Sequence, residues 1–141
     1  MAARFVSIPG LEELRKFVEA SIDMPSIVYL HDPYCPVSAG ALREVSLLDA
    51  EVALIDVHRN PKVSVEVERM TGIRHESPQV IIFQDGAARW SASHRRVTEH
   101  AITRALAAVN GVQAGPPPSG EATQSGARDF WAKLLGRRAP G

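Results

Sequence analysis

The sequence predicts an α/β domain over residues 1–110, in which a central mixed sheet of four to five strands carries helices on both faces. Three observations lead to this fold class. Short apolar runs alternate with amphipathic helical patterns along this part of the chain. The runs at 26–30 and 51–57 are almost entirely apolar, as interior parallel strands are. Asp85-Gly86, between two further runs, is a strong hairpin signal.

Each element follows from a local pattern. The expected strands lie at 4–8, 26–30, 51–57, 79–84 and 87–91, and the expected helices at 11–20, 37–48, 61–71 and 98–109. Apolar residues recur in the helices at a spacing of three or four, as Val63 and Val67 do. Asn60 and Pro61 suit the cap and first turn of the third helix, and Gly72 suits its left-handed end.

The alternation of strands and helices predicts how the strands pair. Successive strand–helix–strand units favour parallel pairs joined by right-handed crossovers. The hairpin then adds an antiparallel strand at one edge of the sheet. This combination is an open α/β sheet with both faces covered.

The composition of the chain changes after residue 110. Residues 111–126 are poor in apolar groups and rich in proline and glycine, so we expect a flexible linker there. Residues 127–141 form a short amphipathic segment with Phe130, Trp131, Leu134 and Leu135 on one side. We expect this segment either to dock on its own domain or to be loosely ordered, and the alternative is a role in binding a partner or a membrane surface.

Charge and cysteine content exclude several function classes. The 16 basic and 16 acidic residues balance, so no overall field favours nucleic acid or an anionic membrane. One cysteine and scattered histidines make a poor zinc site, and we expect neither a bound metal nor a tightly bound cofactor. The chain shows no signal-peptide pattern and no apolar run of membrane-spanning length, which makes a reducing, cytoplasmic setting the expectation.

The only cysteine, Cys35, lies where a strand should give way to a helix. Pro36 suits the first helical position, so Cys35 should stand at a helix N-terminus, where unpaired N–H groups and the helix dipole favour an anion. We therefore expect the thiol pKa to lie below that of free cysteine, which populates the reactive thiolate. The alternative is a buried core cysteine, which the neighbouring Asp32, Pro33 and Pro36 disfavour.

Polar residues near the thiol have predicted roles. Ser38 lies one helical turn beyond Cys35, and its hydroxyl is expected to donate a hydrogen bond to the thiolate, to bond nearby backbone, or to do both. His31 could reach the thiolate as a cation or donor, or could cap strand ends. The other histidines are expected to be structural or to support the site (His75, His94) or to be solvated (His58, His100).

Several stretches resemble a known family. Cys35-Pro36-Val37-Ser38 after a strand is similar to a glutaredoxin-type site with one thiol. Residues 75–80 are similar to the segment of the thioredoxin superfamily that carries a cis-proline, here Pro78, before a core strand. The wider resemblance rests on His31 and on residues 35–39, 41–44, 56–57, 72–80 and 92–94. Together, over about residues 5–108, they resemble the monothiol bacilliredoxins, the YtxJ-like proteins of bacillithiol-using bacteria.

This resemblance implies a thioredoxin-like fold and thiol–disulfide exchange. Cys35 would attack a protein mixed disulfide and accept its bacillithiol group, which a second small thiol, another redoxin or a reductase would then remove. Cys35 and Ser38 would be the catalytic residues. Residues that would contact the small thiol and the substrate are His31, Tyr34, Pro36, Val37, Ser77 and Pro78. A cis bond before Pro78 would turn the Ser77 backbone toward Cys35, where it could pair with an extended peptide.

A single thiol favours one kind of exchange. Attack on a disulfide between two protein thiols would stall, because no second thiol follows to release the substrate. Attack on a disulfide between a protein and a small thiol instead frees the protein. The predicted function is therefore removal of bacillithiol, or a similar small thiol, from S-thiolated proteins. Two alternatives are a glutathione-dependent monothiol glutaredoxin-like protein, and a thioredoxin-like peptide-binding module without turnover.

Overall fold

Five strands form one mixed sheet in the computed structural model, which describes residues 2–111. The strands are β1 (Arg4–Ser7), β2 (Ser26–His31), β3 (Glu51–Asp56), β4 (Gln79–Gln84) and β5 (Ala87–Ser93). The helices are α1 (Leu11–Glu19), α2 (Pro36–Ser46), α3 (Pro61–Thr71) and α4 (Glu99–Gly111), with 3-10 turns η1 (Ala20–Ile22) and η2 (His94–Arg96). The predicted linker beyond Gly111 and the predicted amphipathic segment at 127–141 lie outside the described residues.

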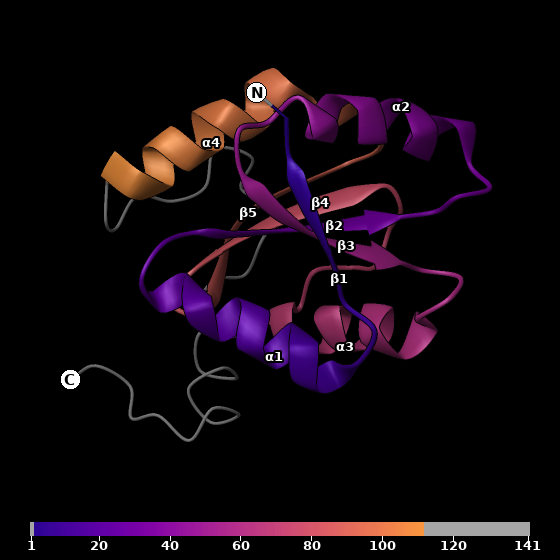
Figure 1. Ribbon diagram of the computed structural model, residues 1–141, viewed down its shortest axis with the longest axis horizontal. Coiled ribbons are helices and arrows are strands. Elements are labelled where there is room, and N and C mark those ends of the chain that lie inside the picture. Colours follow the sequence, from indigo (N-terminus) through magenta and orange to yellow (C-terminus); the bar gives the residue numbers. More distant parts are fainter. Residues whose placement is uncertain (1, 112–141) are drawn as a thin grey trace.

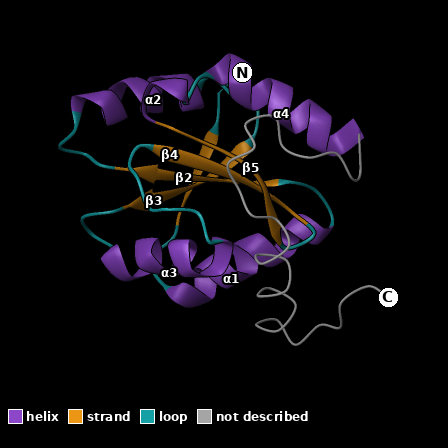
Figure 2. Ribbon diagram, turned by 180° about the vertical axis from the view of Figure 1, so that it is seen from behind, coloured by secondary structure: helices purple, strands orange, loops and turns teal. Residues whose placement is uncertain are grey.

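Helices cover both faces of the sheet, as the sequence predicts. Helices α1 and α3 lie on one face, and α2 and α4 lie on the other (Figures 1 and 2). Alternate residues of β2 enter the two cores: Val28 and Leu30 pack on the α1–α3 side, whereas Ile27 and Tyr29 pack on the α2–α4 side. A strand buried on both faces explains why this stretch reads as a continuous apolar run.

The direction of β4 differs from the expectation of parallel pairing. The strand order is β1-β3-β2-β4-β5, in which β3 runs parallel to both β1 and β2, but β4 runs antiparallel to β2. The reason lies in the connection after α3. Helix α3 carries the chain back along β3, and residues 72–78 are long enough, at about 3.3 Å each when extended, to return it. Consequently β4 begins where β2 ends, with Gln79 opposite Leu30.

The turns follow the predicted chemistry. Gly72 ends α3 in the left-handed conformation at φ 73°. Asp85 and Gly86 both have positive φ, 56° and 75°, and join β4 to the antiparallel edge strand β5. Asn60 occupies the cap position of α3, although its side chain makes no capping hydrogen bond.

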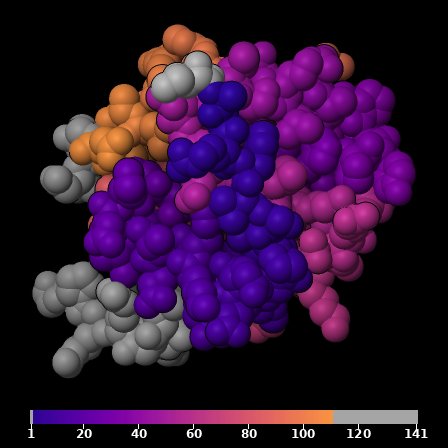
Figure 3. Space-filling view, viewed as in Figure 1, coloured from indigo at the N-terminus to yellow at the C-terminus, as the bar shows by residue number. Residues whose placement is uncertain are grey.

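The other edge of the sheet is β1, which is mostly exposed. The N-terminal residues, coloured indigo, run over the face of the molecule seen in the space-filling view (Figure 3). None of the helices in the described part of the chain combines the length and apolar character that a bilayer crossing needs.

Candidate active site

Three loops meet at one end of the sheet, around the end of β2. Residues 32–35 follow β2, residues 57–60 follow β3, and residues 74–78 precede β4. Strand register brings them together, because His31 pairs with Asp56 of β3 and Leu30 pairs with Gln79 of β4. The Val57 N–H also donates to the His31 carbonyl at 3.0 Å. The C-terminal ends of two parallel strands and the start of an antiparallel one thus surround the cysteine loop.

Cys35 occupies the N-cap position of α2, as its sequence context predicts. Its backbone is extended, with φ −108° and ψ 122°, and Pro36 opens the helix. The Cys35 N–H donates to the Asp32 carbonyl at 3.1 Å, and the Cys35 carbonyl accepts from the Ala39 N–H at 3.1 Å. The residue is partly exposed and its sulfur makes no capping hydrogen bond. The backbone is therefore held at both sides while the thiol stays reachable.

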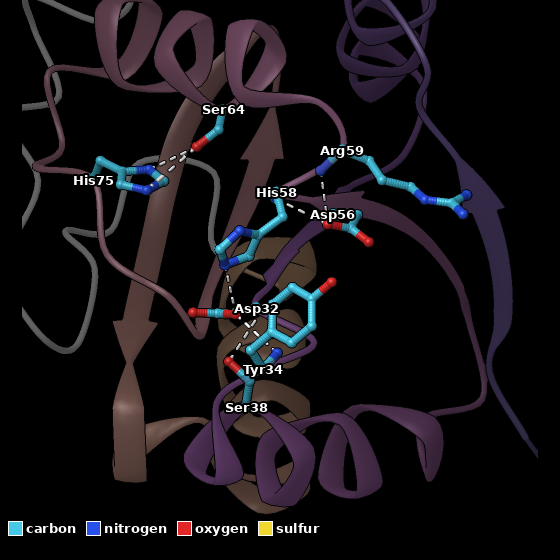
Figure 4. Close-up of polar contacts among 8 residues, drawn as sticks. All are labelled: Asp32, Tyr34, Ser38, Asp56, His58, Arg59, Ser64 and His75. Atoms are coloured by element: carbon cyan, nitrogen blue, oxygen red, sulfur yellow. Dashed lines mark hydrogen bonds and ion pairs between the residues drawn. The ribbon is translucent and has the colours of Figure 1, made fainter.

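The Asp32 carboxylate holds the cysteine loop together. Its Oδ1 accepts from the Tyr34 N–H at 2.9 Å and pairs with His58 Nε2 at 3.0 Å. The Tyr34 ring, 80% exposed, meets the His58 ring edge-on at 4.8 Å between centroids. Figure 4 shows His58 reaching from the loop after β3 toward Asp32. His58 is exposed, as expected, but it is also part of the site, which its sequence position did not indicate.

Ser38 is fully buried in the first turn of α2. Its Oγ accepts from the Asp32 N–H at 3.2 Å, and its carbonyl accepts from the Tyr29 hydroxyl at 3.0 Å. The hydroxyl thus bonds backbone, one of the two roles foreseen for it. Its donation to the Cys35 thiolate stays a prediction.

Tyr29 is a site residue that the sequence analysis missed. Its buried hydroxyl lies between the Ser38 carbonyl and His31 Nδ1, 3.1 Å away. Burial raises the pKa of this hydroxyl far above its usual range; the Ser38 side chain acts to lower this pKa, and the nearby Cys35 acts to raise it. Burial likewise lowers the pKa of His31, against the opposing charges of Asp56 and Asp32. An apolar strand pattern predicts that such a tyrosine is buried, but it does not predict which group its hydroxyl bonds.

The loop before β4 forms the other side of the site. The Ser77–Pro78 peptide bond is cis, and the Pro78 carbonyl accepts from the His94 N–H at 2.9 Å. The buried Gln79 side chain braces the loop, donating to the Arg74 carbonyl at 3.0 Å and accepting from the Glu76 N–H at 3.4 Å. Strand register alone would not have revealed this brace.

Two histidines contact this loop or form part of it. His75 Nδ1 lies 2.7 Å from Ser64 Oγ of α3, a contact drawn in Figure 4. His94 Nδ1 lies 3.6 Å from the Glu76 carboxylate. Both contacts fit the structural role expected for these side chains. The loop is thus tied to α3, to β4 and to the turn after β5.

The site combines the partly exposed Cys35, the loop before β4 and a groove. Pro36 and Val37 line this groove, which passes between α2 and the start of α4. The roles of His31, Tyr34, Ser77 and the others as binding residues stay predictions.

Comparison with known proteins agrees with this geometry. The fold is similar to a candidate oxidoreductase with a thioredoxin fold, with a TM-score of 0.67 at 20% identity over 71% of this chain and 91% of that one. It is also similar to mitochondrial thioredoxin 3 from Saccharomyces cerevisiae, with a TM-score of 0.57 at 14% identity over 72% and 92% of the two chains. Thioredoxin from Fasciola hepatica gives a TM-score of 0.59 at 15% identity over 71% and 94%. These likenesses establish the thioredoxin-like fold.

The family follows from the sequence itself. A family model described as monothiol bacilliredoxin BrxC matches residues 7–102, which include every residue of the site. The family and the fold support a thiol redox role for Cys35, and the presence of one cysteine makes the site monothiol. This chain belongs to the monothiol bacilliredoxin BrxC family.

Proposed function

We propose that this protein is a thiol–disulfide oxidoreductase that removes bacillithiol, or a similar small thiol such as glutathione, from S-thiolated proteins. The observation that carries the proposal is the placement of Cys35. The only cysteine of the chain stands partly exposed at the start of α2, at the end of the sheet where the Pro78 loop also lies. Because no second thiol exists to resolve a protein–protein mixed disulfide, small-thiol caps are the substrates that such a site can process.

The reaction has two steps. The Cys35 thiolate attacks the small-thiol sulfur of the mixed disulfide, so that a new Cys35–small-thiol disulfide forms and the substrate protein leaves as a thiolate, which takes up a proton. A second small-thiol molecule, as thiolate, then attacks the same small-thiol sulfur. This step releases an oxidised small-thiol dimer and returns the Cys35 thiolate. The net reaction reduces the substrate protein and oxidises one free small thiol, which joins the cap as a small-thiol disulfide.

Neighbouring groups support these steps in the proposal. Val37 and Ser38 carry N–H groups in the first turn of α2, where an anion is favoured. The Ser77 backbone precedes Pro78 and would pair with the extended part of the substrate. Tyr34, being highly exposed, would contact the substrate protein. The chemistry requires a compartment that keeps thiols reduced, so a cytoplasmic location is part of the proposal.

The test uses a carrier protein with one exposed cysteine, capped with bacillithiol or with glutathione. Mixed with the reduced protein, the capped carrier should lose its cap while Cys35 gains the mass of the small thiol. The variant Cys35→Ser should leave the carrier capped, and Ser46→Ala, outside the site, should react as the wild type does. Transfer from neither carrier would overturn the proposal. If the wild type transfers no cap, and the wild type and Cys35→Ser bind the carrier equally well, the chain is a peptide-binding module.

A further inference from the structure

A groove lies beside Cys35 between α2 and the turn that leads into α4. Its volume is about 460 Å³, within the range of roughly 300–1,000 Å³ typical of small-molecule sites. Pro36 and Val37, the residues directly after Cys35, line one end of it. The groove therefore adjoins the start of α2, where Cys35 is the N-cap residue.

The two walls of the groove differ in character. Helix α2 contributes the apolar Pro36 and Val37 and, one turn further on, Gly40, which carries no side chain. The opposite wall contains Arg95 of η2 and Thr98 at the start of α4. An apolar wall facing a cation suits a ligand that has a carbon skeleton and a negative charge.

Arg95 is the cation whose charge is not compensated. Its side chain is exposed and forms no hydrogen bond or ion pair with any residue in 2–111. Its neighbour His94 is bound through its N–H to the Pro78 carbonyl, which places η2 at the thiol end of the groove. The His94 side chain is already within 3.6 Å of the Glu76 carboxylate.

The acidic residue of the groove lies further from the thiol. Glu44 is eight residues after Pro36, about 12 Å along α2 at 1.5 Å per residue. Its Oε1 accepts from the Glu99 N–H at 2.8 Å, and Thr98 Oγ1 accepts from the Ala101 N–H at 3.1 Å. The Glu99 and Ala101 amides at the start of α4 are therefore already capped. Recognition of an anion in this groove falls to Arg95.

We propose that this groove binds the small-thiol part of the mixed disulfide and that Arg95 binds its carboxylate. The inference rests on the proposed function of Cys35 and names its substrate class. Bacillithiol and glutathione both carry carboxylates, so the shared chemistry is an anionic thiol cap. Neutral and cationic caps should be poorer substrates, because they leave Arg95 without a partner.

The first experiment measures binding without turnover. S-methylglutathione is titrated into the Cys35→Ser variant, and amide chemical shifts are followed by NMR. We expect shifts at Val37, Gly40 and Thr98, and a rise in Kd of at least about fivefold when Arg95→Ala is added. Arg104→Ala, an exposed arginine on α4 that does not line the groove, is the matched control. No shifts in the groove, or equal Kd values with and without Arg95, would overturn the inference.

A second variant fills the groove without removing charge. A methyl group at Gly40 would have its nearest contact outside the helix backbone at 3.9 Å, from Arg43 Nη2, so Gly40→Ala fits the fold. Alanine also favours the helix over glycine. We expect the melting temperature to be kept or raised while S-methylglutathione binds more weakly. Unchanged binding would show that the ligand lies elsewhere.

The third experiment separates the cap from the carrier protein. One carrier is capped in turn with bacillithiol, glutathione, 2-mercaptoethanol and cysteamine, and the rate of transfer to Cys35 is measured. Arg95→Ala should lower the transfer rate of the anionic caps, bacillithiol and glutathione, by about fivefold. It should lower the transfer rate of the neutral 2-mercaptoethanol cap by less than about twofold. Equal slowing of all four would mean that Arg95 contacts the carrier and would overturn the inference. If the wild type accepts none of the four caps, the function proposed for Cys35 is contradicted. The binding experiment still tests whether the groove binds the small thiol, because it needs no turnover.

Discussion

The two loops beside Cys35 are held in place in different ways. Residues 32–35 are held by the buried Ser38 hydroxyl, which bonds the Asp32 N–H, and by one pair near the surface, in which the His58 side chain facing Asp32 is 52% exposed. Residues 74–78 are held by buried side chains, because Gln79 is 4% exposed and Ser64 is 3% exposed. Exposed pairs contribute little free energy, whereas a buried polar group left without its partner costs much more. Loss of the His58–Asp32 pair should therefore affect chemistry more than stability, whereas loss of the buried contacts behind the second loop should affect stability.

The largest effect should follow from Gln79→Ala. This change leaves the Arg74 carbonyl without its buried donor, so we expect the free energy of unfolding to fall by about 1–3 kcal/mol. Gln84→Ala at the other end of β4 is the control and should stay within about 0.5 kcal/mol of the wild type. Chemical denaturation measures both. Equal losses in the two variants would mean that the brace on the Pro78 loop contributes nothing.

A smaller loss is expected from Ser64→Ala, which removes the contact between α3 and His75. We expect the free energy of unfolding to fall by about 1 kcal/mol, which is the usual net contribution of one hydrogen bond. A double-mutant cycle with His75→Ala should give a coupling energy of at least about 0.5 kcal/mol. Ser46→Ala serves as the control, since its hydroxyl bonds the Arg43 carbonyl at the surface. Additive losses would show that the two side chains act independently.

His31 should make stability depend on pH. Because burial lowers its pKa in the folded state, the folded protein binds fewer protons than the unfolded chain as pH falls below about 6.5. The contribution of His31 to stability is thus fully present above that pH and is lost on acidification. Denaturation at pH 7.5 and 5.5 should show a smaller drop for His31→Gln than for the wild type. An equal loss of stability between pH 7.5 and 5.5 in both proteins would show that His31 does not cause the pH dependence.

The smallest change in stability is expected from His58→Ala. The pair with Asp32 is exposed, so the free energy of unfolding should change by less than about 1 kcal/mol. The rate of cap transfer should nevertheless fall by about two- to fivefold, because the Asp32 loop that carries Cys35 loses one support. His100→Ala on α4 should leave the rate unchanged. A stability loss as large as that of Gln79→Ala would contradict the comparison of the two loops.

Local sequence patterns determined the elements and the position of the thiol. The apolar run at 26–30 identified a strand buried on both faces, Gly72 identified the end of α3, and Pro36 placed Cys35 at a helix N-terminus. These features depend on backbone preferences of a few adjacent residues and on periodic burial, both of which the sequence displays directly. The resemblance of His31 and of residues 35–39 and 72–80 to bacilliredoxins led to the family that the comparison establishes.

The tertiary structure alone decided which distant groups meet. The antiparallel direction of β4, the contact of His58 with Asp32 and the hydrogen bond from Tyr29 to the Ser38 carbonyl each join parts of the chain that no local pattern relates. Arg95 and Val37 are likewise brought to one groove only by the packing of η2 and α4 beside α2. Periodicity reports which side of an element is buried, but not which element covers it. The partners are selected by packing of the whole chain, and the chemistry beside Cys35 depends on those partners.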